Sequence, residues 1–194
     1  MLQVAKAASC KLLSYRGQYT AYRIELPSVK KRVAAVKVDD GYFRIFRQVS
    51  DAAQALELVI KLAAYRDNLA ISFHRQGYCL WIYEPEVKSA RSDQSSGPVR
   101  LPTYGPANCF IIRSERYYRI CYIKVPDLPE RLLAIYYGRQ FYSLYKSGLD
   151  ASAVLKTATK FVGRGDAVAI APTKQGYALC LLEPEAIPYR PKKS

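Results

Sequence analysis

The sequence predicts an α+β protein in which one β-β-β-β-α-β-β unit is written twice. Residues 76–86, QGYCLWIYEPE, return as residues 175–185, QGYALCLLEPE. The second segment starts 99 positions after the first (175 against 76), and the same offset pairs Cys10 with Cys109. Apolar residues alternate with period two on both sides of a segment with helical period. We therefore expect antiparallel sheets, each covered by one helix, in a pseudo-twofold arrangement.

The first unit begins with four predicted strands and a helix. Asp40-Gly41 is typical of a tight hairpin, because glycine readily adopts the positive φ that such a turn needs. Ser50 or Asp51 is a suitable helix N-cap, since either side chain can accept a hydrogen bond from a free backbone N–H. The predicted strands are residues 11–15, 19–26, 32–38, 42–49, 69–73 and 78–83, and the predicted helix is residues 50–65.

The second unit repeats this order after a connector. Its helix is predicted between Asp150, a capping residue, and Gly163, a stop signal. The predicted strands are residues 110–113, 117–125, 131–137, 140–146, 167–171 and 177–182, and the helix is residues 150–162. The chain therefore divides into a first unit (1–86), a flexible connector without apolar period (87–107), a second unit (108–186) and a basic, mobile tail (187–194).

The charge of the chain indicates a polyanionic partner. Among 194 residues, 30 are Lys or Arg and 16 are Asp or Glu, which gives a net charge of +14. Both units contribute, with 13 basic against 8 acidic residues in 1–86 and 11 against 7 in 108–186. A basic protein of this kind binds nucleic acid, an anionic membrane surface or an acidic protein. Of these three partners, nucleic acid is the one that we expect first.

The strand pattern predicts a sheet face on which aromatic rings alternate with cations. We assign Tyr22, Ile24, Leu26, Phe43 and Ile45 to the face under the helix. Rings interleaved with Lys and Arg on an open sheet can stack unpaired bases and bind phosphates. The alternative is that these rings pack against the other unit as a second core. The candidate nucleic-acid-binding residues are Tyr19, Arg23, Lys30, Lys31, Arg32, Lys37, Tyr42, Arg44, Phe46, Tyr118, Tyr122, Lys124, Tyr136, Phe141 and Tyr145.

Signals for catalysis and metal binding are missing from the sequence. His74 is the only histidine, and the five cysteines contain no C-x-x-C pair, so reduced thiols are expected. The two Glu-Pro-Glu segments are better explained by turns than by paired acid–base carboxylates. We expect no enzyme activity, no metal and no cofactor. No secretory signal or membrane-spanning run is visible, which predicts a cytoplasmic protein that is not integral to a membrane.

The element order resembles that of a known group of binding proteins. Residues 11–65 and 110–163 each read as four antiparallel strands followed by a helix, which is similar to the β4-α unit of the coactivator PC4 and the plant Whirly proteins. Lys30-Lys31-Arg32 followed by small residues is also similar to a basic stretch in Whirly proteins. The resemblance implies binding of single-stranded nucleic acid on the sheets. The two strands predicted after each helix depart from that pattern.

These observations together predict a non-enzymatic protein that binds single-stranded DNA or RNA on basic, aromatic sheet surfaces. A regulatory role and a homo-oligomer are compatible with the sequence. The alternative is a protein-interaction or assembly factor whose basic surface docks an acidic protein partner or a membrane-bound complex. Solvent exposure of the rings would favour the first function, and burial between the units would favour the second.

Overall fold

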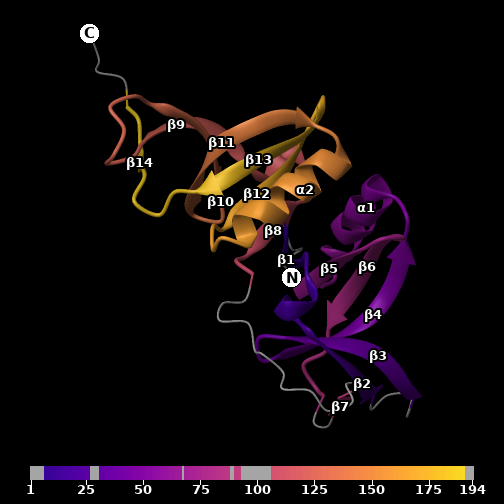
Figure 1. Ribbon diagram of the computed structural model, residues 1–194. Coiled ribbons are helices and arrows are strands. Elements are labelled where there is room, and N and C mark those ends of the chain that lie inside the picture. Colours follow the sequence, from indigo (N-terminus) through magenta and orange to yellow (C-terminus); the bar gives the residue numbers. More distant parts are fainter. Residues whose placement is uncertain (1–6, 27–30, 67, 88–89, 93–105, 191–194) are drawn as a thin grey trace.

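The computed structural model describes residues 7–26, 31–66, 68–87, 90–92 and 106–190. It is a mixed α+β fold with one large sheet and two helices (Figure 1). In the first part of the chain the elements are β1 (Ala7–Leu13), β2 (Thr20–Leu26), β3 (Lys31–Val38), β4 (Gly41–Val49), α1 (Ala52–Leu62), β5 (Asn68–His74), β6 (Gly77–Tyr83) and β7 (Ala90–Ser92), with a 3-10 turn η1 at Arg16–Gln18. Every strand and the helix predicted for residues 11–83 is present within a few positions.

The second part of the chain adds the other half of the sheet. Its elements are β8 (Cys109–Ile112), η2 (Glu115–Tyr117), β9 (Arg119–Lys124), β10 (Leu132–Tyr137), β11 (Gln140–Leu149), α2 (Ala151–Val162), β12 (Val168–Thr173), β13 (Gly176–Leu182) and β14 (Ile187–Pro188). The strand order across the sheet is β14-β9-β10-β11-β13-β12-β8-β1-β5-β6-β4-β3-β2-β7. Figure 1 shows the two outer groups of strands at opposite ends of the molecule.

A single sheet replaces the separate antiparallel sheets that the sequence predicts. Strands β1 and β8 pair antiparallel with Cys10 opposite Cys109, and this seam joins the two halves. Two of the pairings are parallel: β1 with β5, and β8 with β12. The prediction of purely antiparallel sheets was wrong because β1 and β8 pair with strands that follow the helices, and a helical crossover can join parallel neighbours.

Both helices lie on the same side of the sheet and share one core. In each helix an aspartate accepts a hydrogen bond from a backbone N–H in the first turn, 2.8 Å for Asp51 with Gln54 and 2.7 Å for Asp150 with Ala153. Their apolar faces and the sheet residues beneath them form a single cluster that includes the fully buried Leu56 on α1 and Leu155 on α2. We call this the helix side of the sheet, and the opposite side the far side.

The far side carries one smaller core in each half. Leu13 on β1 packs in a cluster with Val36 and Val38 on β3, although three strands separate β1 from β3 in the sheet. The sheet must therefore curl back on itself, and a salt bridge of 3.2 Å between Lys11 and Asp39 joins the same two regions. A comparable cluster around Ile112, Ile135 and Tyr142 fills the far side of the second half.

The predicted assignment of sheet faces was wrong for both sides of β4. Tyr42 and Arg44, together with Lys37 opposite Tyr42, lie on the helix side, although they were expected on the face that the helix does not cover. Phe43 packs in the far-side cluster with Trp81, and Ile45 packs against the same cluster, whereas both were expected under the helix. The reason is a β-bulge between Ile45 and Arg47, where one extra residue shifts the register against β6. Val49, after the bulge, packs on the helix side. Simple alternation from Val49 would place Ile45 and Phe43 on the same side, but the extra residue turns both to the far side.

Two short strands lie where the sequence predicts irregular segments. Ala90–Ser92 forms β7 inside the predicted flexible connector, and it pairs antiparallel with β2 at one edge of the sheet. Ile187–Pro188 forms β14 inside the predicted mobile tail and pairs with β9 at the other edge. Neither strand has the alternating apolar pattern of a predictable strand, because two or three residues are too few to show a period.

Burial of Tyr142 makes the fold sensitive to alkaline pH. The side chain is 1% exposed and its hydroxyl donates to Gln140 Oε1 at 3.0 Å. Burial, with lesser contributions from Tyr137 and Cys109, raises the pKa of Tyr142 from 10.0 to about 12. Below pH 10 folded and unfolded chains both hold the proton. Above it the unfolded chain ionises first, so stability falls until the pH rises through about 12.

The variant Tyr142→Phe tests this dependence because it keeps the ring and removes the titrating group. We expect its free energy of unfolding to fall less steeply between pH 10 and about 12 than that of the unmodified protein. Urea unfolding at several pH values measures this slope. Tyr65→Phe is the control, since Tyr65 is 86% exposed. Identical slopes for Tyr142→Phe and the unmodified protein would contradict the assignment.

Candidate nucleic-acid interface

In the first half, basic and aromatic side chains gather on the helix side of β2, β3 and β4. Cross-strand pairing places Tyr22 opposite Ala35 and Ala35 opposite Arg44, while Lys37 lies opposite Tyr42. The rings of Tyr22 and Tyr42 meet edge to face with centroids 5.5 Å apart. The Lys37 ammonium lies 5.8 Å from the Tyr42 centroid. These three residues form a compact cation–ring group in which every member is partly exposed.

Arg44 extends this group toward the end of β6. Its Nε donates to the carboxylate of Glu84, the residue that follows β6. The first glutamate of the Glu-Pro-Glu segment therefore holds an arginine in place. In the second half the corresponding Glu183 accepts a hydrogen bond of 2.6 Å from Ser143. Both contacts favour the predicted structural role of these segments over acid–base chemistry.

In the second half, the helix side carries two pairs of contacting rings. Tyr136 and Phe141 lie on paired strands with centroids 4.9 Å apart. Tyr145 meets Phe161 on α2 at 4.8 Å. Tyr145 and its counterpart Phe46 both sit at the bulges of their strands, and both are exposed. A bulge redirects a side chain away from the ladder, which explains why these two rings reach solvent.

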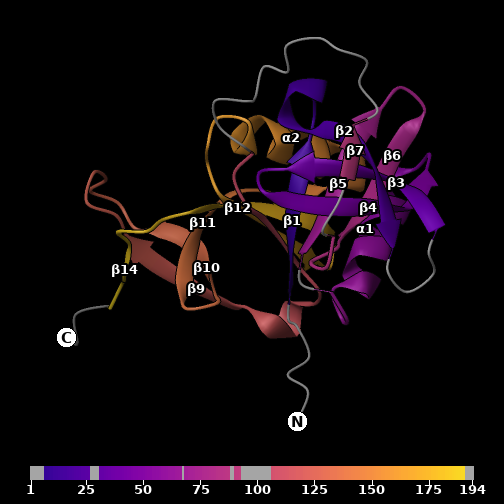
Figure 2. The same ribbon diagram turned by 90° about the horizontal axis from the view of Figure 1, so that it is seen from below.

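The far side of the outer strands β9 and β10 carries the densest group of rings and cations. The Arg131 guanidinium lies 4.4 Å from the ring centroid of Tyr122 and 5.3 Å from that of Tyr189. The Lys124 ammonium lies 5.8 Å from the Tyr189 centroid. Tyr122 remains 44% exposed. Figure 2 shows β9, β10 and β14 together on one flank of the molecule, so these residues lie at its periphery.

Sequence reasoning found Tyr122 and Lys124 but missed Arg131, Tyr189 and Tyr22. Tyr22 was assigned to the core under the helix. Arg131 is the first residue of the predicted strand 131–137, and its position 99 residues after Arg32 was the only signal that linked it to the candidate residues. Tyr189 lies in the predicted tail, where its backbone N–H donates to the carbonyl of Tyr122 at 2.9 Å. The short strand β14 brings it beside β9, and that contact has no sequence signature.

Several predicted residues do not join these groups. Tyr19 packs against the far-side core of the first half, and the Tyr118 hydroxyl donates to the Pro172 carbonyl at 2.9 Å in the second half. Burial raises the pKa of both phenols, which fits a packing role.

The remaining basic residues lie on exposed parts of β2 and β3. Lys31, Arg32 and Arg23 are exposed, and cross-strand pairing places Arg23 on the opposite side of the sheet from Tyr22. Lys30 lies outside the described residues. Predicted rings are thus divided between core and surface, and those of Tyr122, Tyr136 and Tyr145 are exposed.

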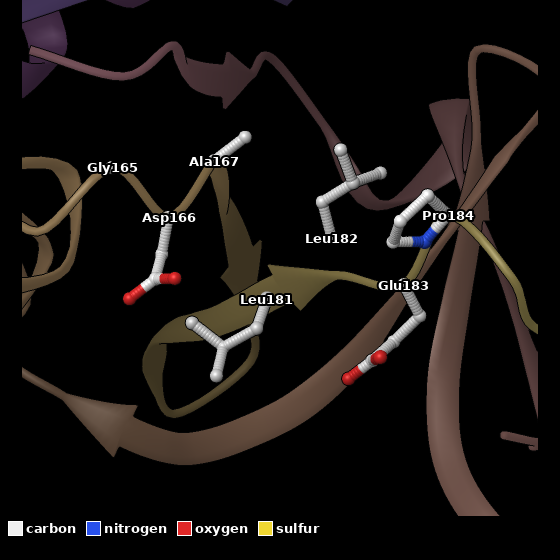
Figure 3. Close-up of a pocket in the computed structure, with 7 residues that line it drawn as sticks. All are labelled: Gly165, Asp166, Ala167, Leu181, Leu182, Glu183 and Pro184. Carbon is white, nitrogen blue, oxygen red and sulfur yellow. The ribbon is translucent and has the colours of Figure 1, made fainter. Parts of the chain in front are cut away.

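A shallow cavity near the end of β13 offers no comparable chemistry. It has a volume of about 460 Å³ and is lined by Gly165, Asp166, Ala167, Leu181, Leu182, Glu183 and Pro184. Figure 3 shows Asp166 on one side of Leu181 and Glu183 on the other. Glu183 accepts a hydrogen bond from Ser143, which fits a structural role for this carboxylate. The ring and cation groups are the better candidate site.

Other classes of site receive no support from the described residues. Within them, no three His, Cys, Asp or Glu side chains gather as metal ligands. In the same part of the chain, neither helix is long and apolar enough to cross a membrane. Comparison of the chain with protein-family models, with curated proteins and with solved structures finds no match.

Proposed function

We propose that this protein binds single-stranded DNA or RNA and is not an enzyme. The observation that carries the proposal is the placement of the Arg131 guanidinium over the rings of Tyr122 and Tyr189 on an exposed sheet surface, with Lys124 close to Tyr189. Aromatic faces stack on unpaired bases of any sequence, and each stacked base contributes about 1–3 kcal/mol. Cations beside the rings neutralise the phosphates of the same strand.

The charge and the repeat support the same proposal. A net charge of +14 favours a polyanionic ligand. We further infer that the chain is an internal duplication with pseudo-twofold symmetry about the β1–β8 seam. The offset of 99 in the sequence and the pairing of Cys10 with Cys109 support this inference. The group of Lys37, Tyr42 and Tyr22 would then add a second basic-aromatic surface.

We extend the proposal to a cytoplasmic, regulatory protein related in element order to PC4 and the Whirly proteins. The five cysteines are free thiols, as expected in a reducing compartment. The element order of residues 11–65 and 110–163 supports the relation, and a regulatory role follows only from that relation.

Fluorescence anisotropy with labelled single-stranded DNA, single-stranded RNA and duplex DNA tests the proposal. We expect a single strand to bind more tightly than the duplex at both low and moderate salt, because stacking does not depend on counterion release. Arg131→Gln should weaken single-strand binding several-fold and lower the salt slope by about 0.7, the value for one phosphate contact. Arg66→Gln, an exposed arginine beyond α1, is the matched control.

Weak binding to all three ligands that disappears at moderate salt would contradict the proposal, since it would reflect charge alone. So would equal effects of Arg131→Gln and Arg66→Gln. Those outcomes would favour the alternative, an assembly factor that docks an acidic protein partner or a membrane-bound complex, and a homo-oligomer would be sought by light scattering.

A further inference from the structure

The far side of β9 and β10 presents a continuous exposed surface, which we call the β9–β10 platform. It consists of Ile120, Tyr122 and Leu133, with Lys124 and Arg131 at its border. Tyr122 is the cross-strand partner of Leu133, and Ile120 is two residues before Tyr122 on the same strand, so the three side chains share one side of the sheet. They are 71% (Ile120), 44% (Tyr122) and 39% (Leu133) exposed.

The corresponding positions of the first half carry different side chains. Ala21, Arg23 and Ala34 stand 99 positions before Ile120, Tyr122 and Leu133, and Arg23 is likewise the cross-strand partner of Ala34. Glu25 stands where the second half has Lys124. Strands β2 and β3 nevertheless pair over their full length. Large apolar side chains at these positions are therefore not needed to form the ladder.

Contact of large apolar side chains with water is unfavourable, and neighbouring side chains of this kind on a surface usually mark an interaction site. Here the apolar groups border a tyrosine ring and the guanidinium that lies over it, and a base presents an apolar π-face of similar size. A guanidinium that stacks through its face keeps its N–H groups at the edge, where a phosphate can accept from them. The platform thus combines the two kinds of contact that one nucleotide offers.

We propose that the β9–β10 platform stacks the bases of a single strand, and that the equivalent surface of the first half does not. This inference rests on the proposed function. It predicts that recognition of bases, as opposed to phosphates, depends on the β9–β10 platform and not on the equivalent far-side surface of the first half.

The test compares an oligothymidine with an abasic oligonucleotide of the same length, which keeps the phosphates and lacks the bases. Affinities of the full chain are measured by anisotropy. We expect the unmodified protein to prefer the oligothymidine by at least about fivefold, since one stacked base contributes about 1–3 kcal/mol. Tyr122→Ala should remove most of this preference and leave affinity for the abasic strand unchanged. Tyr122→Phe, which keeps the ring, should retain the preference.

Two control variants separate the platform from other surfaces. Arg23→Ala changes the equivalent position of the first half, and Tyr65→Ala removes an exposed ring elsewhere; neither should alter the preference for bases. An unchanged preference in Tyr122→Ala, an equal loss in Arg23→Ala, or full retention in Tyr122→Leu would overturn the inference. Failure of the unmodified protein to bind either strand would instead overturn the proposed function. Circular dichroism verifies that each variant is folded.

Discussion

Replacing Gly77 with alanine should lower the free energy of unfolding by about 3 kcal/mol or more. Gly77 has a φ of +126°, a region that L-residues rarely adopt. An added Cβ would also lie 2.1 Å from the Val49 carbonyl oxygen and 2.6 Å from the Ser50 Cα. Both are backbone atoms at the junction of β4 and α1, so they cannot rotate away as a side chain would. Strain and collision therefore add.

Gly165→Ala provides the matched control for Gly77→Ala. Gly165 has a φ of +98°, but nothing lies within 4 Å of a Cβ built there. Only the backbone strain applies, and we expect a loss of about 1–2 kcal/mol. Urea unfolding followed by circular dichroism measures both variants. If Gly77→Ala were no more destabilising than Gly165→Ala, the close packing of the β5–β6 turn against the end of β4 would be refuted.

Leu155→Ala should destabilise the protein by about 2–5 kcal/mol, the usual cost of a large-to-small change in a tight core. Leu155 on α2 is fully buried in the cluster that also contains Leu56 on α1. Because both halves contribute to that cluster, the substitution should lower the stability of the first half as well as that of the second. Trp81 is the only tryptophan and lies in the first half, so its fluorescence reports on the half that does not contain the substitution.

We expect the Trp81 fluorescence transition of Leu155→Ala to move together with the circular dichroism transition, as in a two-state system. The control is Leu128→Ala, in an exposed turn, which should change stability by less than about 0.5 kcal/mol. A Trp81 transition that stays in place while the circular dichroism signal splits would show that the halves unfold separately.

Elements with strong local signals could be predicted from the sequence, and pairings between distant strands could not. The aspartate caps and helical period located α1 and α2, and Asp40-Gly41 located the turn between β3 and β4. The parallel partnership of β1 with β5 depends on a crossover, which leaves no local pattern. The pairing of β1 with β8 is equally unpredictable, because the apolar sequence of a buried strand does not indicate which strand lies beside it.

The candidate site was predictable only in part for a related reason. Alternation predicted which residues of β2 share a side, but the bulge at Phe46 reversed the assignment of Phe43 and Ile45. A single extra residue changes every side assignment on the strand segment beyond it. Arg131 and Tyr189 come together with Tyr122 through β14, whose two residues are too few to create a recognisable period.

The seam has a consequence for synthesis of the chain on the ribosome. Strand β1 is made first, yet its second neighbour, β8, begins only at Cys109. Until then β1 presents an open strand edge, and two nascent chains on one message carry identical edges. Such edges pair with each other when they meet. We therefore expect the nascent first half to be open to pairing with a second copy until β8 emerges and occupies the edge.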